Sequence, residues 1–330
     1  MLKKILIIRL SSFGDIAQCM ATITPLKKKF PEAEIFWFTK DEFKPLISFH
    51  KEVNGIFTLN KKTGFLGLIK LAFKIRDEKF DLIYDAHANL RSMFLRPILG
   101  FLSPTKIIKR PKDRFKRLLL FWFRINKFPK PFRGIKSYLA PLNYLGVNQE
   151  TEILKIDSFL DFKKWIPFET FIVLAPSAAW ELKRWPIDYW KKLIELLPGE
   201  NIVILGGPDD KFCKELENVS PEKCINLAGV LSFSESVQFV SKANLVISGD
   251  TGIIHIADLL GIKGILLMGP SAFGFTTGPH IKIMERQLEC RPCTKDGRGK
   301  CSNEEYKKCL VDIRPLDVAY LASSWATKRS

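Results

Sequence analysis

Short apolar runs alternate with amphipathic stretches along most of the chain. Runs of Val, Ile, Leu and aromatic residues predict strands at 5–10, 35–39, 55–59, 81–85, 171–175, 201–206, 245–248 and 264–268. Apolar residues that recur every three or four positions predict helices at 16–30, 64–78, 186–197, 209–218, 232–242 and 252–260. Because apolar strands that alternate with helices are typical of parallel sheets covered on both faces, the pattern predicts an α/β fold.

The alternation occurs twice, which predicts two doubly wound parallel-sheet domains. A length of 330 residues agrees with two domains, and the pattern is interrupted at 161–168, where Pro167 stands. We therefore expect a first domain at 1–160 and a second at 161–330, with the last helix free to return to the first domain. Paired domains of this kind bind ligands in the crevice at the carboxyl ends of their strands.

A polar motif follows the strand predicted at 245–248. Asp250, Thr251 and Gly252 stand between this strand and a helix, and His255 lies one turn inside the helix. The first N–H groups of a helix have no intrahelical partner and carry partial positive charge, so they form a seat for a phosphate group. The same residues also fit a plain N-cap, and both interpretations stay open.

The loops after three other predicted strands carry candidate chemistry. Asp15 follows the first strand, where a carboxylate could accept a proton from a sugar hydroxyl or cap a helix. Lys183 and Arg184 follow the strand at 171–175 and offer fixed positive charge to a pyrophosphate, while the neighbouring Trp185 is expected to anchor the loop. Asp210 follows a Gly-Gly-Pro-Asp turn, where it could reach ribose hydroxyls or only cap the next helix.

Taken in order, these segments resemble the lipopolysaccharide heptosyltransferases, glycosyltransferase family 9. The matching pieces are Ser-Ser-Phe-Gly-Asp-Ile after the first strand, Asp-Leu-Ile-Tyr-Asp-Ala-His at 81–87, Lys-Arg-Trp-Pro, Gly-Gly-Pro-Asp, the Asp-Thr-Gly-x-x-His box and Ile-Leu-Leu-Met-Gly-Pro at 265–270. The resemblance implies a GT-B fold, with two Rossmann-like domains that face a central cleft. It also implies an inverting transfer of heptose from ADP-heptose to the inner core of lipopolysaccharide.

The resemblance implies Asp15 as general base and Lys183 as partner of the pyrophosphate, both of them catalytic. With the loop residues above, the expected donor-binding set is Ser177, Lys183, Arg184, Asp210, Asp250, Thr251, Gly252 and His255. The expected acceptor-binding set is Ser12, His87, Arg110, Arg114 and Arg117. In the loop before the lysine, family members commonly have a hydroxyl residue where this chain has Ala178 and Ala179, a departure that bears on the nucleotide sugar.

Positive charge is concentrated in the first half of the chain. The formal net charge is +17, and residues 1–160 contain 30 Lys and Arg against 14 Asp and Glu. Between 106 and 136 there are 12 basic residues and one acid, around the apolar run 118–123. This composition fits a segment that lies on an anionic membrane face, and it equally fits a solvated basic face over a core helix. A nucleic-acid partner is not expected, because no nucleic-acid-binding signature is present.

The first residues, Met-Leu-Lys-Lys followed by a short apolar run and Arg9, do not form a signal peptide. We therefore expect a cytoplasmic protein, peripherally associated with the inner membrane, whose seven cysteines are mainly thiols. Cys290, Cys293, Cys301 and Cys309 have spacing that fits a structural zinc, reduced cysteines or disulfides. No cofactor is expected for catalysis, since no Asp-x-Asp triplet is present to chelate a metal and a lysine with a helix dipole would neutralise charge.

Two other functions compete with heptose transfer. One is a GT-B transferase that uses another nucleotide sugar, such as a UDP-hexosamine. The other is a non-catalytic protein on the same scaffold that binds anionic surfaces, as the basic first half suggests. Asp15 and Lys183 favour an enzyme over the latter.

Overall fold

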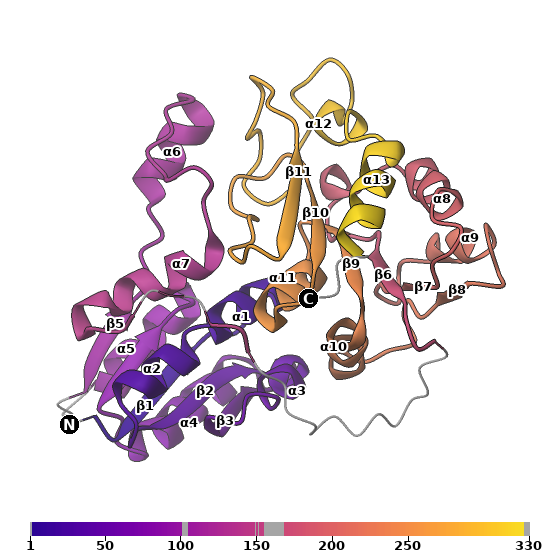
Figure 1. Cartoon of the computed structure of the whole chain (residues 1–330). Coiled ribbons are helices and arrows are strands. Elements are labelled where there is room, and N and C mark those ends of the chain that lie inside the picture. Colours follow the sequence, from indigo (N-terminus) through magenta and orange to yellow (C-terminus); the bar gives the residue numbers. More distant parts are fainter. Residues whose placement is uncertain (1, 101–104, 149, 151, 155–167, 327–330) are drawn as a thin grey trace. The chain divides into compact units, whose positions relative to one another are not determined.

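The computed structural model describes residues 2–100, 105–148, 150, 152–154 and 168–326. They fall into two compact units, each built on one parallel sheet (Figure 1). Unit 1 comprises residues 1–114 and 135–156, and unit 2 comprises residues 115–134 and 157–330. The parallel α/β architecture predicted from the hydrophobic pattern is confirmed in both units.

Unit 1 has a five-stranded sheet in the order β3-β2-β1-β4-β5. Its strands are β1 (Lys4–Ile8), β2 (Glu34–Lys40), β3 (Val53–Leu59), β4 (Leu82–Asp85) and β5 (Lys106–Lys109). Its α-helices are α1 (Phe13–Met20), α2 (Ile23–Lys29), α3 (Lys44–Ile47), α4 (Gly64–Asp77), α5 (Leu90–Gly100) and α7 (Gly134–Leu139). Short 3-10 turns stand at η1 (Asp41–Phe43), η2 (Lys61–Thr63) and η3 (Ala140–Leu145).

Helices α4 and α5 cover one face of the unit 1 sheet. Leu68, Ala72 and Ile75 of α4 pack with Leu95 and Leu99 of α5 in one buried cluster. The same cluster contains alternate strand residues of the sheet, which are Leu6, Ile8, Phe38 and Ile83. Since alternate strand residues point to one face, the inward face of each helix meets a continuous apolar layer. The inner sides of both helices are therefore fully occupied by the fold.

Unit 2 has a six-stranded sheet in the order β11-β10-β9-β6-β7-β8. Its strands are β6 (Ile172–Ala175), β7 (Ile202–Ile204), β8 (Cys224–Asn226), β9 (Leu245–Gly249), β10 (Gly264–Met268) and β11 (Ile281–Glu285). Its helices are α8 (Ile187–Glu195), α9 (Cys213–Glu217), α10 (Phe233–Lys242), α11 (Gly252–Leu260), α12 (Lys308–Val311) and α13 (Pro315–Ala326), with a 3-10 turn η4 (Glu181–Lys183). Helix α6 (Arg114–Trp122) begins at the last residue of the first part of unit 1 and continues into unit 2.

Three predicted features differ from the structure. The helix expected at 16–30 is two helices, because Pro25 has no N–H to continue a helix across 21–22 and Thr22 instead bonds the Cys19 carbonyl. The segment 115–134, expected in the first domain, packs with unit 2. The C-terminal helix α13 does not return to the first domain, since its apolar residues Val318 and Ala322 belong to the core of unit 2. The expected boundary at 160 lies outside the described residues.

None of the helices formed by the described residues is both long enough and apolar enough to cross a membrane. Helix α6 carries the apolar run predicted at 118–123, and of its apolar residues only Leu120 is buried. Phe115, Leu118 and Trp122 are exposed. Leu119 and Phe121 are half-buried, so the alternative of a basic face over a core helix accounts for only part of this run.

Candidate active site

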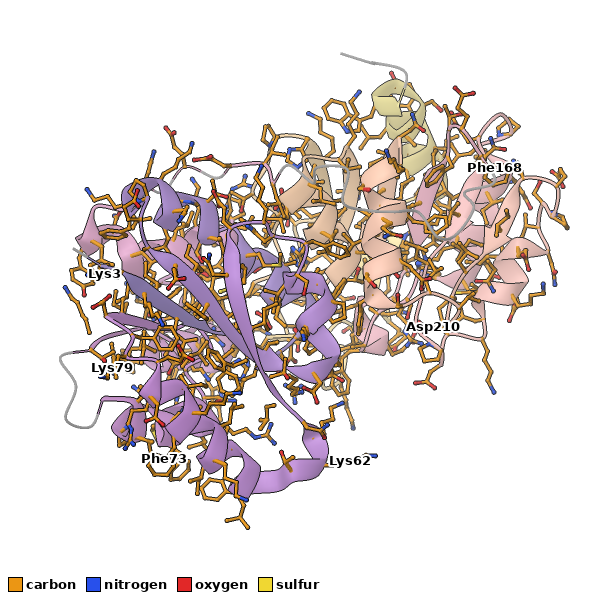
Figure 2. All side chains as sticks on the ribbon, turned by 90° about the horizontal axis from the view of Figure 1, so that it is seen from below. Lys3, Lys62, Phe73, Lys79, Phe168 and Asp210 are labelled. Carbon is orange, nitrogen blue, oxygen red and sulfur yellow. The ribbon has the colours of Figure 1, made fainter. Side chains whose placement is uncertain are left out.

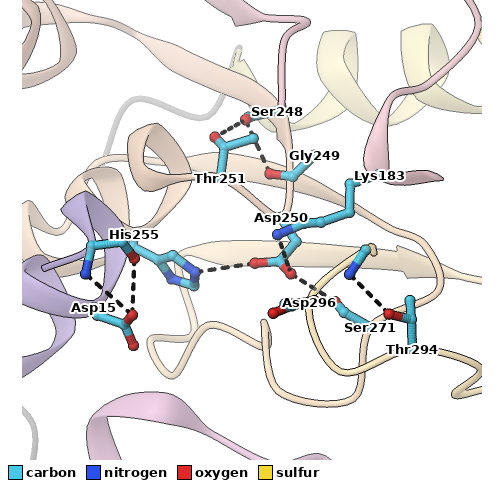
Figure 3. Close-up of polar contacts among 12 residues, drawn as sticks. Asp15, Lys183, Ser248, Gly249, Asp250, Thr251, His255, Ser271, Thr294 and Asp296 are labelled. Carbon is cyan, nitrogen blue, oxygen red and sulfur yellow. Dashed lines mark hydrogen bonds and ion pairs between the residues drawn. The ribbon is translucent and has the colours of Figure 1, made fainter. Parts of the chain in front are cut away.

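A lysine, a carboxylate and a histidine meet at the carboxyl end of the unit 2 sheet (Figure 3). Asp250 follows β9, and its Oδ2 lies 2.8 Å from the Lys183 Nζ. Its Oδ1 lies 3.3 Å from the His255 Nε2, and the Ser271 hydroxyl donates to Oδ2 at 2.6 Å. We call Lys183, Asp250, His255 and Ser271 the donor cluster. All four side chains are largely buried, so these contacts are formed away from bulk solvent.

Electrostatics keep the carboxylate of the donor cluster ionised. Burial alone would raise the pKa of Asp250, but the charge of Lys183 and the hydrogen bond from His255 lower this pKa to well below its ordinary value. A buried ion pair is stable only when each charge has partners. The cluster therefore holds one ammonium group in a fixed place beside the start of helix α11.

The predicted helix start is present where expected. Thr251 is the N-cap residue of α11, and its side chain makes no cap hydrogen bond but lies 2.8 Å from the Ser248 hydroxyl. The helix begins at Gly252, as predicted. A seat for phosphate at this end of the helix agrees with the geometry, since the cap side chain does not occupy the first N–H groups.

Two glycines let loops of unit 2 approach the donor cluster. A Cβ atom at Gly274 would stand 2.0 Å from the Asp250 Cγ, and one at Gly297 would stand 2.6 Å from the Lys183 Cγ. Gly297 also has a φ of +95°, a conformation that side chains disfavour. The sequence predicted neither glycine as part of the donor site, although Gly297 stands between Cys293 and Cys301 of the cysteine motif. Their close approach to Asp250 and Lys183 connects them to it.

The remaining predicted donor residues are mostly engaged in holding loops. Arg184 donates to the Ala178 carbonyl at 2.9 Å, and the Asp210 Oδ2 accepts the Gly207 N–H at 2.7 Å. This contact closes the Gly-Gly-Pro-Asp turn, and the N-cap residue of the next helix, α9, is Phe212 and not Asp210. Ser177 is half-buried at the end of β6. The Trp185 Nε1 donates to the carbonyls of Leu310 and Ile313, which agrees with the predicted loop anchor.

In unit 1, Asp15 lies in a second cluster of polar groups at the carboxyl end of β1. The Arg9 Nη2 is 2.6 Å from the Asp15 Oδ2, and the Tyr138 hydroxyl donates to Oδ1 at 3.0 Å. The Ser12 hydroxyl donates to Oδ2 at 2.9 Å, and Ser12 and Asp15 form the capping box of α1. Arg110 stacks over the Tyr138 ring at 3.9 Å. We call these five residues the carboxylate cluster.

The carboxylate cluster also fixes a charge state. Burial works to raise the pKa of Asp15, but Arg9, Ser12 and Arg110 outweigh it, so this pKa lies well below its ordinary value. The Asp15 side chain is still 41 % exposed. Both interpretations of Asp15 thus hold geometrically, because it contributes to the cap of a helix and presents an ionised, accessible carboxylate.

Arg9 and Tyr138 were missed from the sequence. Arg9 is buried and also donates to the Ala86 carbonyl at 3.0 Å, while the Tyr84 hydroxyl donates to the Tyr138 carbonyl at 2.7 Å. Tyr138 is 123 positions from Asp15, so no local pattern connects them. The only signal for Arg9 was its position directly after an apolar strand, where a charge needs a partner.

The predicted acceptor residues are divided between the units. Ser12, His87 and Arg110 belong to unit 1, and burial with the charge of Arg9 lowers the pKa of His87 to about 3. Arg114 is exposed at the start of α6. Arg117 belongs to unit 2 and lies 4.7 Å over the Phe273 ring. Four of the five predicted acceptor residues therefore belong to unit 1 and one to unit 2.

Phe273, on which Arg117 packs, lines a cavity that the sequence did not predict. This cavity of unit 2, of about 320 Å³, is lined by aromatic residues of 120–132 and of the loop after β10. The rings of Phe128 and Phe132 meet Phe273 at 5.1 and 4.9 Å between centroids. These contacts explain why residues 115–134 belong to unit 2.

The four-cysteine zinc site is not supported. In the part of the chain that the structure describes, no group of three or more His, Cys, Asp or Glu residues is arranged to hold a metal ion. All seven cysteines are free, so the disulfide alternative is not supported either. Cys309 is buried on α12 in the core, where burial raises the pKa of its thiol to about 11.

Two parallel α/β units with charged side chains at the carboxyl ends of their strands are the architecture of the GT-B fold. The family model "Glycosyltransferase family 9 (heptosyltransferase)" matches residues 68–307, and the chain belongs to that family. The family and the enzyme class implied by the sequence motifs are thus confirmed.

Known proteins resemble the chain over nearly its full length. It is 26 % identical to lipooligosaccharide heptosyltransferase 2 of Haemophilus influenzae, over 94 % of this chain and 96 % of that one. The structure of Escherichia coli ADP-heptose lipopolysaccharide heptosyltransferase II matches with a TM-score of 0.76 at 19 % identity, over 98 % of each chain. That of E. coli heptosyltransferase WaaC with ADP matches with a TM-score of 0.70 at 18 % identity, over 98 % and 99 %. These likenesses confirm the predicted fold class.

Proposed function

We propose that this glycosyltransferase transfers heptose from ADP-heptose to the inner core of lipopolysaccharide with inversion at the anomeric carbon. The observation that carries the proposal is the donor cluster, in which Lys183, Asp250 and His255 meet beside the start of α11. Membership of a heptosyltransferase family supports the sugar, and a structural neighbour that was solved with ADP supports the nucleotide.

Lys183 is the group proposed to neutralise the leaving nucleotide. When the bond between the anomeric carbon and the phosphate oxygen breaks, negative charge grows on the pyrophosphate, and a fixed ammonium group with a helix N-terminus stabilises it. Asp250 is a poor phosphate ligand because it is an anion. Its contacts with Lys183, His255 and Ser271 suit it to position the cation instead. No metal cofactor enters this proposal.

Asp15 is the proposed general base. It would accept the proton of the acceptor hydroxyl as the oxygen attacks the anomeric carbon. The contacts with Arg9 and Tyr138 keep its carboxylate ionised and fix its orientation, although they also reduce its basicity. Such a base contributes mainly by its position.

The acceptor is proposed to be reached at the cytoplasmic face of the inner membrane. Ser12, His87 and Arg110 are the acceptor candidates beside Asp15, and cationic side chains suit an acceptor that carries acidic sugars and phosphates. Exposed aromatic and basic residues of α6, among them Phe115 and Trp122, support peripheral contact with an anionic bilayer.

Calorimetric titration with ADP, UDP and GDP tests the donor. We expect ADP to bind most tightly, and a preference for UDP would favour a different nucleotide sugar. The sequence argument for that alternative is that Ala178 and Ala179 stand in the donor loop where family members commonly have a hydroxyl residue. Mass spectrometry of lipopolysaccharide from a deletion strain tests the acceptor, since the inner core should lack a heptose. An unchanged core would contradict the proposal.

Lys183→Ala should raise the KM for the donor and lower kcat, together by about ten- to a hundredfold, because a charged hydrogen-bond partner is lost. Lys183→Arg should restore part of the loss. Lys192→Ala is the matched control, since Lys192 is an exposed lysine of α8 that pairs with Glu195 on the same helix. Normal donor kinetics in a folded Lys183→Ala variant would contradict the assignment of Lys183 to the donor site.

A further inference from the structure

Exposed apolar side chains gather on the outer side of helices α4 and α5 in unit 1. Leu66, Leu90, Phe65 and Phe94 have exposed fractions of 74, 65, 57 and 57 %, and Met93 is also exposed. The rings of Phe65 and Phe94 meet edge to face at 6.0 Å between centroids, which joins the two helices into one surface. We call these five residues the α4–α5 patch. Phe73 continues it along α4 and, like Lys62 before that helix, lies at the outer edge of unit 1 (Figure 2).

The fold does not require these side chains to be apolar. The core under the two helices is formed by other residues, including Leu68, Ala72 and Leu95. A contiguous exposed apolar surface on a folded unit usually marks an interaction site. The exposed apolar side chains of the α4–α5 patch therefore indicate that this surface binds a partner.

Basic residues surround the patch. Residues 61–78 contain five Lys and Arg, with Asp77 and Glu78 at the far end of α4, and residues 86–100 contain Arg91 and Arg96 and no acid. Lys62, Lys70 and Arg91 are exposed beside the apolar side chains. A partner must therefore accept bulky apolar groups at its centre and positive charge around them.

This combination selects one occupant. A second copy of the chain, docked patch to patch, would bring two rows of cations together, which is unfavourable. An anionic bilayer satisfies both requirements, since apolar side chains enter the boundary between headgroups and acyl chains while Lys and Arg meet the lipid phosphates.

The position of the patch within unit 1 agrees with this occupant. Phe65 and Leu66 lie in the first turn of α4, and Leu90, Met93 and Phe94 lie at the start of α5. These helices follow β3 and β4, whose carboxyl ends lie at the same edge of the parallel sheet as that of β1, which leads to Asp15. A bilayer at the patch would therefore be near the edge that carries the proposed base.

We propose that the α4–α5 patch docks unit 1 on the anionic surface of a lipid bilayer. This surface is distinct from the basic segment 106–136. The expectation that docking increases heptose transfer to an acceptor in the membrane rests on the proposed function. Docking itself does not, because it requires neither the donor nor the acceptor.

The test is sedimentation of the full-length protein with vesicles that contain neither acceptor nor nucleotide sugar. Vesicles of phosphatidylethanolamine with phosphatidylglycerol should bind the wild type more tightly than vesicles of phosphatidylcholine. Leu66→Asp with Leu90→Asp should weaken binding to the anionic vesicles by roughly tenfold for each side chain. The matched control is Leu316→Asp, which changes an equally exposed leucine of α13. Thermal unfolding should show that both variants remain folded.

Equal binding of a folded double variant and the wild type to anionic vesicles would overturn the proposal. So would a wild-type dimer in light scattering that the double variant abolishes while vesicle binding is unchanged, since the occupant would then be a second copy. Transfer assays separate this result from the proposed function. The double variant should lose activity on acceptor embedded in vesicles and keep it on a deacylated, water-soluble acceptor. Failure of the wild type on both would instead count against heptose transfer itself.

Discussion

Asp15 shows how one side chain can serve two purposes at once. Its carboxylate completes the capping box of α1 and is held by Arg9 and Tyr138. Capping stabilises the fold by about 1 kcal/mol, whereas a general base changes the rate by roughly 10²–10⁴. The two contributions can therefore be measured separately.

Asp15→Asn should reduce kcat by roughly 10²–10⁴ while ADP binding changes little. The melting temperature should fall because buried Arg9 loses its counter-charge, so turnover is measured below the melting temperature of the variant. Because the pKa of Asp15 is lowered, the group stays ionised in the wild type, and we expect it to cause no loss of kcat between about pH 5 and 8. Steady-state kinetics across this range, with calorimetry of ADP binding, measure both effects. Near-normal turnover would leave Asp15 as a helix cap only.

Gly274 offers a test of the donor cluster, because a larger residue at this position would collide with Asp250. A Cβ atom would overlap the Asp250 carboxylate, so Gly274→Ala should displace that group from Lys183 and raise the KM for the donor by about tenfold or more. Gly199→Ala is the matched control, since no atom lies within 4 Å of its added Cβ. Donor kinetics and thermal unfolding of both variants decide the matter, and similar kinetics in the two would refute the assignment.

At the scale of elements, the hydrophobic pattern predicted the central strands and the edge strand β3, and it missed the other three edge strands. β9, β10 and α11 agree with prediction to within one residue, since each is a continuous apolar run with a polar stop. The unpredicted strands β5, β8 and β11 all lie at the edge of a sheet. Edge strands are short and interrupted by polar residues, as in Lys-Ile-Ile-Lys of β5, so they give no clear apolar run.

The site residues that directly follow strands could be predicted from the sequence, whereas those that join the site from distant parts of the sequence could not. Lys183, Asp250 and His255 come together as the motifs implied, because parallel strands end at one edge. Ser271 joins them from the loop after β10, and Tyr138 joins Asp15 from beyond α6. These contacts depend on tertiary packing, for which the sequence contains no local pattern.

Trp185 connects the donor loop to the C-terminal elements of unit 2. Its indole N–H donates to carbonyls of Leu310 and Ile313, on and just after α12. Trp185→Phe removes the donor while keeping an aromatic ring, so we expect a loss of about 1–3 kcal/mol in the free energy of unfolding. Trp122→Phe, at an exposed position of α6, should have almost no effect. Urea denaturation of both variants checks this expectation, which equal stabilities would contradict.

At the scale of the whole molecule, the net charges of the two folded units differ from the net charges of the two halves of the sequence. Residues 161–330 alone are nearly neutral, with 22 Lys and Arg against 21 Asp and Glu. With 115–134 included, unit 2 holds 28 against 22, while unit 1 holds 24 against 13. Both units are thus cationic, at +6 and +11, and each has basic side chains to offer to an anionic surface.

Replacement of Arg114 and Lys127 by Gln should weaken binding to anionic vesicles by about 1 kcal/mol per charge and leave ADP affinity unchanged. These exposed cations are preferable to Arg117, whose guanidinium packs on Phe273. Lys192→Gln with Lys214→Gln, on the exposed faces of α8 and α9, is the control pair. Vesicle sedimentation and calorimetry give the result. Reduced ADP affinity with normal vesicle binding would assign the basic segment to the donor.

The assignment of 115–134 to unit 2 means that the chain passes between the units three times, near 114, 134 and 156. No single cut therefore yields two intact pieces. A fragment ending at 160 would carry Phe128 and Phe132 without Phe273, and its complement would expose the ring they cover. Chimeras that exchange unit 2 between family members should accordingly transplant both 115–134 and the stretch that begins near 157, because unit 2 is discontinuous in sequence.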